Sequence, residues 1–184
     1  MNAFIISLGL LPLLRLVILG YQGDLTANPI EFITRSTGTW ALVFLCITLA
    51  VTPLRKITGL SQLLKYRRTF GLFVFFYASL HFSIWFWLDH DLSFSEMIND
   101  VIKRPFITMG FSAFVLLVPL ALTSNDWAVR KLKRTWSKLH RLVYLIAILV
   151  ILHYFWHKSG KNDFQTVGIY AAIIFSLLAY RLKR

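Results

Sequence analysis

Six long apolar runs, separated by short segments that hold most of the charge, divide this sequence of 184 residues. A helix needs about 20 mostly apolar residues to cross the hydrocarbon core of a bilayer, and roughly 17 is the usual lower limit. The runs therefore predict an all-α integral membrane protein, a six-helix transmembrane bundle that forms a single domain over residues 1–184. The expected helices cover approximately residues 3–20, 38–54, 69–88, 106–123, 139–157 and 165–181.

The composition excludes several other classes of protein. Hydrophobic residues make up 57% of the chain and charged residues only 15%, so neither a soluble domain nor a charged disordered tail is expected. The net charge of +12 does not indicate a nucleic-acid partner, because the basic residues lie in short clusters between the apolar runs. The expected helices contain no Asp or Glu and show no obvious internal repeat, which argues against an ion-coupled transporter.

The distribution of basic residues predicts that both termini are cytoplasmic. Lys and Arg are retained on the cytoplasmic side of a membrane protein. Segments 55–68 and 124–138 each contain five of them, and the tail adds Arg181, Lys183 and Arg184. The opposite side has only Arg35, Lys103, Arg104, Lys158 and Lys161.

Acidic residues show the reverse distribution. Seven of the eight fall on the outer side. They form a docking surface for a partner, or they lie there only because basic residues are retained on the inner side. These seven are Asp24, Glu31, Asp89, Asp91, Glu96, Asp100 and Asp163.

Histidine dominates the ionisable chemistry expected inside the membrane. His81 lies about 12 residues beyond the inner start of its helix, or roughly 18 Å deep, and His153 about 14 residues beyond the start of its own, or roughly 21 Å. Both helices run in the same direction, so the two imidazoles reach a similar level. Two facing imidazoles at one depth are what a six-coordinate haem iron needs. A structural pair bonded to carbonyl oxygens and a transition-metal site are the open alternatives.

A third histidine, His140, lies 13 residues before His153 and hence about 20 Å nearer the cytoplasm. It could ligate a second haem, but the position expected for an inner partner holds Arg68 or Arg67, and a charged guanidinium does not ligate iron. These two arginines are either topogenic charges or a clamp for a phosphate or a haem propionate. His90 and His157 are expected to be solvated residues at the membrane edge.

Several motifs, in order, resemble one bacterial membrane family. They are TGTWAL and TPL around the second helix, RRTFGL and YASLHF with His81, KRPFITMG and LTSNDW around the fourth, and LHRLVYLIAILVILHYFW with His140 and His153. The chain is similar over nearly its whole length to the haem-binding membrane subunits of methionine sulfoxide reductase systems, within the ferric-reductase-like transmembrane group.

This resemblance implies haem b ligated by the intramembrane histidines and a flavin mononucleotide (FMN). It also implies electron delivery across the bacterial inner membrane to a periplasmic molybdopterin reductase, MsrP, which repairs oxidised methionines. Related NADPH oxidases carry two histidines on the third helix and a cytoplasmic flavin and NADPH domain, whereas this helix has one and no such domain is expected. Electrons should therefore come from membrane quinol or a cytoplasmic flavin reductase. The competing functions are a stand-alone transmembrane metalloreductase or quinol-oxidising cytochrome b, and a non-redox scaffold or channel.

Overall fold

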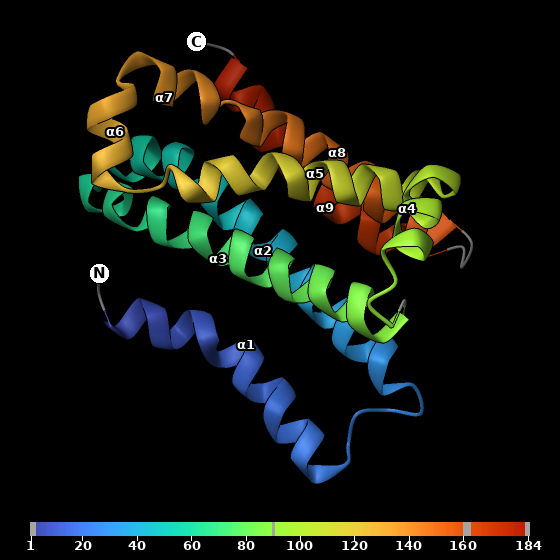
Figure 1. The fold of residues 1–184 in the computed structure, drawn as a ribbon. Coiled ribbons are helices and arrows are strands. Elements are labelled where there is room, and N and C mark those ends of the chain that lie inside the picture. The colour runs from blue at the N-terminus through green and yellow to red at the C-terminus, as the bar shows by residue number, and fades with distance from the viewer. Residues whose placement is uncertain (1–2, 90, 160–162, 183–184) are drawn as a thin grey trace.

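The computed structural model of the protein describes residues 3–89, 91–159 and 163–182. Six of its helices are long and apolar enough to cross a membrane, as the sequence predicts. These spans run along α1 (Ala3–Gln22), α2 (Pro29–Thr58), α3 (Leu64–Ile84), α5 (Pro105–Leu122), α8 (Leu142–Ser159) and α9 (Phe164–Leu182), which Figure 1 shows as a bundle.

The second span is longer than the apolar run that predicts it. Helix α2 begins at Pro29, where the side chain of Asn28 accepts a hydrogen bond of 3.2 Å from the Glu31 backbone, and proline suits the first turn. It ends at Thr58, and the next residue, Gly59, has a φ of 74° that allows its N–H to bond the Arg55 carbonyl. The apolar run ends where charged residues begin, whereas the helix itself continues past them to its capping residues.

Short helices that the apolar runs do not predict connect the spans. They are η1 (Ser61–Leu63), the π-helical turn η2 (Trp85–Asp89), α4 (Phe94–Lys103), α6 (Asp126–Leu132) and α7 (Arg134–Leu139). Ser93 and Asn125 cap α4 and α6, with side-chain oxygens that accept from Glu96 N and Ala128 N. The expected helix over 139–157 is correspondingly divided, because Leu139 closes α7 and α8 begins at Leu142.

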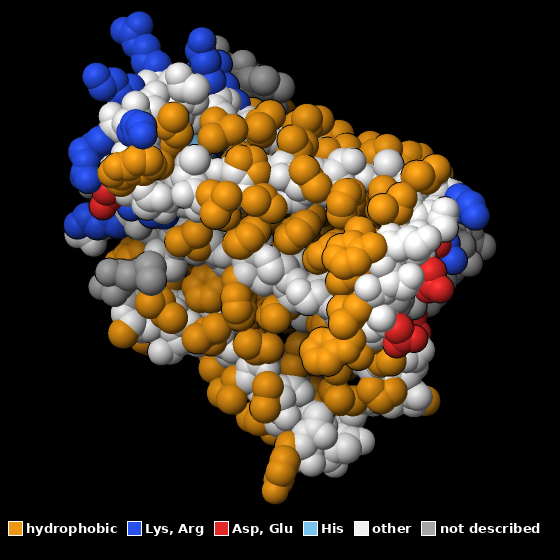
Figure 2. Space-filling model, viewed as in Figure 1, with side chains coloured by type: hydrophobic (Ala, Val, Ile, Leu, Met, Phe, Trp, Pro, Cys, Tyr) orange, Lys and Arg blue, Asp and Glu red, His pale blue; other side chains and the backbone are white. Residues whose placement is uncertain are grey.

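The two ends of the bundle differ in charge. Helix α1 begins and α9 ends at the end that holds α6 and α7, while α4 lies at the opposite end (Figure 1). Figure 2 shows apolar side chains around the middle of the visible face, Lys and Arg crowded at the α6 and α7 end, and acidic groups at the α4 end. An apolar belt between two polar ends is what a bilayer requires of a protein that spans it.

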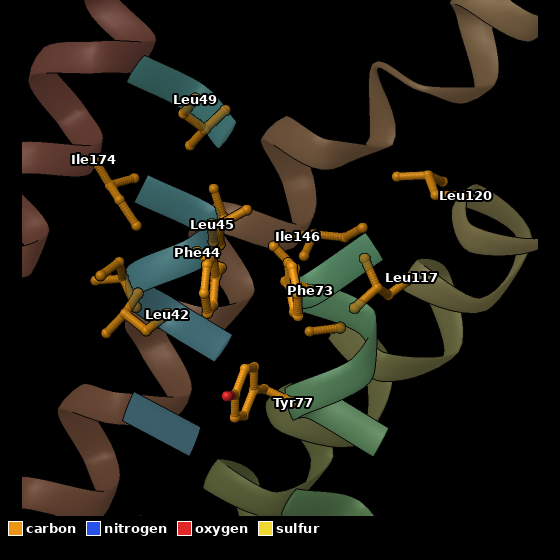
Figure 3. Packing of buried hydrophobic residues seen from close by; sticks show 14 of the residues in the cluster. Leu42, Phe44, Leu45, Leu49, Phe73, Tyr77, Leu117, Leu120, Ile146 and Ile174 are labelled. Carbon is orange, nitrogen blue, oxygen red and sulfur yellow. The ribbon is translucent and has the colours of Figure 1, made fainter. Parts of the chain in front are cut away.

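The core lies between α2, α3, α5, α8 and α9. Figure 3 shows Phe44 facing Phe73 and Tyr77, with ring centroids 5.0 and 5.5 Å apart. Helix α1 packs Ile6 and Leu13 against this core, and the Tyr77 hydroxyl donates to its Gly9 carbonyl at 2.7 Å. The free Cys46 packs against the same core. The aliphatic members shown are Leu42, Leu45, Leu49, Leu117, Leu120, Ile146 and Ile174.

Candidate functional site

The structure brings the imidazole rings of His81 on α3 and His153 on α8 close together, in an edge-to-face arrangement, near the α4 end of the bundle. Their ring centroids are 6.1 Å apart and their planes meet at 76°. A metal ion bonded at about 2 Å to one nitrogen of each imidazole would hold the centroids roughly 6 Å apart. The two rings are therefore spaced to share one metal ion between them.

Hydrogen bonds fix which nitrogen of each imidazole is available. His81 Nδ1 lies 2.9 Å from the Thr34 carbonyl oxygen on α2, and His153 Nδ1 lies 2.7 Å from the Phe106 carbonyl oxygen on α5. A carbonyl oxygen only accepts, so each Nδ1 carries the proton and donates it. Each neutral ring then keeps a lone pair on Nε2, the arrangement that orients a metal-ligating histidine.

A glycine makes room for each ring on the helix it packs against. A Cβ on Gly38 would lie 3.1 Å from the His81 ring, and a Cβ on Gly110 only 2.7 Å from His153 Nδ1. Real Cβ atoms essentially never approach within 3.0 Å of a heavy atom. Gly110 must therefore be glycine if the His153 ring is to stay where it lies, whereas a methyl group at Gly38 would require the His81 ring to shift by a few tenths of an ångström.

The two halves of the site repeat one geometry. Each histidine follows its carbonyl partner by 47 residues, and each glycine lies one helical turn after that carbonyl residue. The hairpin of α2 and α3 thus corresponds to that of α5 and α8, with residue numbers that differ by 72 throughout (34 and 106, 81 and 153). Matched pairs at the same offset line the space between them: Leu42 and Phe114, Leu45 and Leu117, Val74 and Ile146, Ala78 and Val150. Most paired side chains differ in identity, so the sequence alone shows no repeat.

A cavity of about 460 Å³ lies between the four helices and contains the faces of both histidines. This volume falls in the range of roughly 300–1,000 Å³ typical of sites for small molecules and cofactors. Its deep wall is apolar, with Leu45, Val74, Leu117 and Ile146, whereas the end beside α4 carries the only cations among its lining residues. These are Arg35, Arg104 and Lys158.

The donor set favours a macrocycle over a bare transition-metal ion. Within residues 3–89, 91–159 and 163–182, no group of three or more His, Cys, Asp or Glu residues could hold a metal. Protein sites for bare ions usually supply three or four such ligands. A porphyrin supplies four nitrogens itself and needs two axial ligands, which the His81 and His153 pair would provide.

His140 does not join this pair. Its ring stacks on Trp136 with centroids 3.9 Å apart, and its Nδ1 lies 3.1 Å from the Trp136 carbonyl oxygen. It is not among the residues that line the cavity. His140 therefore belongs to a separate environment at the α6 and α7 end.

The side chains of Arg67 and Arg68 lie in different surroundings. Arg68 is exposed and pairs with Asp126 at 2.7 Å, which holds the pKa of that carboxyl below its usual range. Arg67 is partly buried and interacts electrostatically with Arg181 and Tyr144. Arg181 also donates to the Leu49 carbonyl at 2.7 Å. The structure therefore separates the two neighbours instead of bringing them to one ligand.

The sequence predicts that His157 and His90 are both solvated residues at the membrane edge. His157 is not simply a solvated edge residue, because it lines the cavity and its ring lies 6.0 Å from that of Phe106. His90 lies outside the described residues. Sequence reasoning missed the two carbonyl partners, Thr34 and Phe106, and the two glycines. Glycines inside long apolar helices were the available signal.

Comparison with known proteins adds independent findings. Residues 37–151 match the family model described as ferric reductase like transmembrane component. The chain is 57% identical over 176 residues to the protein-methionine-sulfoxide reductase heme-binding subunit MsrQ of Ralstonia nicotianae, covering 95% of this chain and 81% of that protein. It is 54% identical to the MsrQ of Bordetella pertussis and 48% to that of Polaromonas naphthalenivorans, covering 95% and 94% of this chain and 84% and 80% of those proteins. No solved structure matches.

Proposed function

Because the chain belongs to the MsrQ heme-binding subunits of the ferric reductase-like transmembrane family, we propose that it carries electrons across the membrane to a protein-methionine-sulfoxide reductase. The acceptor would be a periplasmic molybdopterin enzyme, MsrP. The donor would be membrane quinol, or a cytoplasmic flavin reductase. The location that fits this role is the bacterial inner membrane, with the whole chain acting as one transmembrane unit.

The observation that carries the proposal is the pair of imidazoles in the cavity. His81 and His153 lie 6.1 Å apart by their centroids, and each donates its Nδ1 proton to a backbone carbonyl. These are the residues that would hold haem b. Bound there, haem b would supply one-electron redox chemistry within an apolar shell.

The chain's own residues set the conditions for that chemistry. Thr34 and Phe106 orient the two imidazoles through their carbonyl oxygens, which also raises the basicity of each Nε2. Leu45, Val74, Leu117 and Ile146 exclude water from the deep wall of the cavity. The position beside α4 places the site close to one membrane surface, where a docked acceptor would receive the electron.

FMN is a further part of the proposal, and the structure changes which arginine suits its phosphate. Arg68 is engaged with Asp126, whereas Arg67 lies beside Arg181 and Tyr144. Two neighbouring guanidinium groups favour a phosphate more than one does. Arg67 and Arg181 are therefore the better candidates to hold the flavin phosphate.

A visible spectrum of the detergent-purified protein tests the haem assignment. A reduced-minus-oxidised difference spectrum should show the sharp bands of a low-spin haem, because two imidazoles ligate the iron. A protein that binds no haem under conditions in which it is folded would instead support a non-redox scaffold.

The orientation of the bundle gives a separate prediction. The basic end with α6 and α7 should face the cytoplasm, because basic loops are retained there. A reporter fused after Arg184 should therefore read cytoplasmic, and one placed in the 89–104 segment should read periplasmic. If both read on the same side, the six-span topology is wrong.

His140 gives a prediction about stoichiometry. We expect one firmly bound haem per chain, since His81 and His153 would supply one pair of axial ligands and His140 stacks on Trp136 outside the cavity. His140→Ala should leave the haem content of the purified protein unchanged and act instead on the donor side, beside the flavin or quinol. Pyridine haemochrome assays that give two haems per chain, with one lost in this variant, would contradict this.

A further inference from the structure

The outer mouth of the cavity, defined as its end beside α4, is chemically unlike the rest of its wall. Arg35 lies near the start of α2, and Lys158 lies at the end of α8. Arg104 immediately precedes α5. The opposite wall is built from leucine, valine and isoleucine. A ligand that fills the cavity would therefore meet positive charge at one edge only.

The internal repeat shows that this charge is confined to particular positions. Along the deep wall both members of each matched pair are apolar, whereas at the mouth a cation corresponds to an apolar residue: Arg35 to Ile107 and Lys158 to Phe86. The cavity is thus nearly two-fold symmetric along its apolar depth and loses that symmetry at the mouth. A planar ligand with one anionic edge would match this distribution.

Two buried polar atoms at the mouth have no hydrogen-bond partner. The buried Nε of Arg35 and the buried hydroxyl of Thr34, both on α2, have no hydrogen-bond partner. Arg35 also forms an ion pair with Glu31 at 2.9 Å, but a guanidinium has five donors and can serve a second anion. Lys158 contacts Asp163, and its side chain is only 16% exposed. The Arg35 Nε is therefore a donor free to bond an acceptor placed in the cavity, because a buried N–H gains most from a partner.

Resting on the proposed function, we propose that Arg35 and Lys158 clamp the two propionate carboxylates of the haem at the outer mouth. Porphyrin propionates cannot face the deep wall, because an ionised carboxylate in apolar surroundings is strongly unfavourable. At the mouth, the guanidinium and the ammonium supply charge-assisted hydrogen bonds. The clamp sets the orientation of the haem plane and directs its carboxylate edge toward the membrane surface beside α4.

Reconstitution of the full-length apo-protein with haem b and with its dimethyl ester tests the clamp. The ester keeps the iron and the ring but removes both charges, so the wild-type protein should bind haem b at least tenfold more tightly. The variant Arg35→Gln with Lys158→Gln should bind the two porphyrins equally. Arg35→Lys should restore part of the preference, and Lys103→Gln, on the same side but outside the cavity lining, should retain all of it.

The midpoint potential provides a second readout in protein that has bound haem. Removing nearby cations stabilises the ferric form, so the midpoint of the double variant should fall below that of wild type. Its pH dependence near neutrality should steepen, because the propionate pKa rises when its cations are lost. Equal binding of haem and ester by wild type, or an unchanged preference and midpoint in the double variant, would overturn the clamp. Failure of wild type to bind either porphyrin would overturn the haem assignment itself.

Discussion

Replacing either His81 or His153 with alanine is expected to abolish the low-spin haem spectrum. If both imidazoles ligate the iron as proposed, each substitution would remove one of its two axial nitrogens and leave the porphyrin held largely by packing. It also leaves a carbonyl, of Thr34 or of Phe106, without its imidazole donor. The measurement is the haem-to-protein ratio and the difference spectrum of each purified variant, compared at equal protein content.

His157→Ala is the matched control for these variants. His157 lines the same cavity, but the facing imidazole pair is formed without it. Its removal should leave the bands of the low-spin haem in place. A His81→Ala protein with a normal spectrum would show that the facing pair is not the axial pair.

Substitution of Gly110, which packs against the His153 ring, should impair haem binding nearly as much as substitution of the histidine itself. In Gly110→Ala the new methyl group would lie 2.7 Å from His153 Nδ1 and 2.9 Å from its Cε1, so the ring must move. That movement breaks the 2.7 Å hydrogen bond to the Phe106 carbonyl and rotates the lone pair of Nε2. Overpacking of a filled interior costs about 1–3 kcal/mol. We expect the affinity for haem to fall roughly tenfold or more, measured by titration of the apo-protein.

Substitutions at two other glycines provide a graded comparison for the effect of Gly110→Ala on haem affinity. Gly38→Ala should have a smaller effect of the same kind, because its nearest contact with the His81 ring is 3.1 Å. Gly168→Ala on α9 should have none, since nothing lies within 4 Å of the added carbon. An affinity that is unchanged in Gly110→Ala would mean that the His153 ring does not occupy its observed position when haem binds.

The spans and the histidine pair could be predicted from the sequence because both follow from simple geometry. Runs of uncharged apolar residues predict membrane helices well, since an unsatisfied backbone is not tolerated in lipid. The equal depth of His81 and His153 follows from the rise per residue along two parallel helices. Their separation of 6.1 Å does not, because rotation about each helix axis depends on packing with neighbouring helices.

The features that could not be predicted from the sequence depend on contacts between segments far apart in the chain. The carbonyl partners of the histidines lie 47 residues away, and Arg68 finds Asp126 on α6 across 58 residues. Short helices such as α6 and α7 are too polar and too brief to give an apolar periodicity. The cations at the cavity mouth looked like ordinary outer-loop charges, because only the folded bundle shows that Arg35 and Lys158 line the space beside the histidines.

Electron delivery to the acceptor tests the central claim most directly. The haem-loaded protein, reconstituted in liposomes with quinol and MsrP, should support continuous reduction of methionine sulfoxide, and the His81→Ala and His153→Ala proteins should not. In a stopped-flow experiment, addition of MsrP with its substrate to the reduced protein should restore the oxidised spectrum. If the reduced protein is never reoxidised by MsrP but is reoxidised by soluble ferric chelates, the electron-delivery account is wrong and the protein is a metalloreductase.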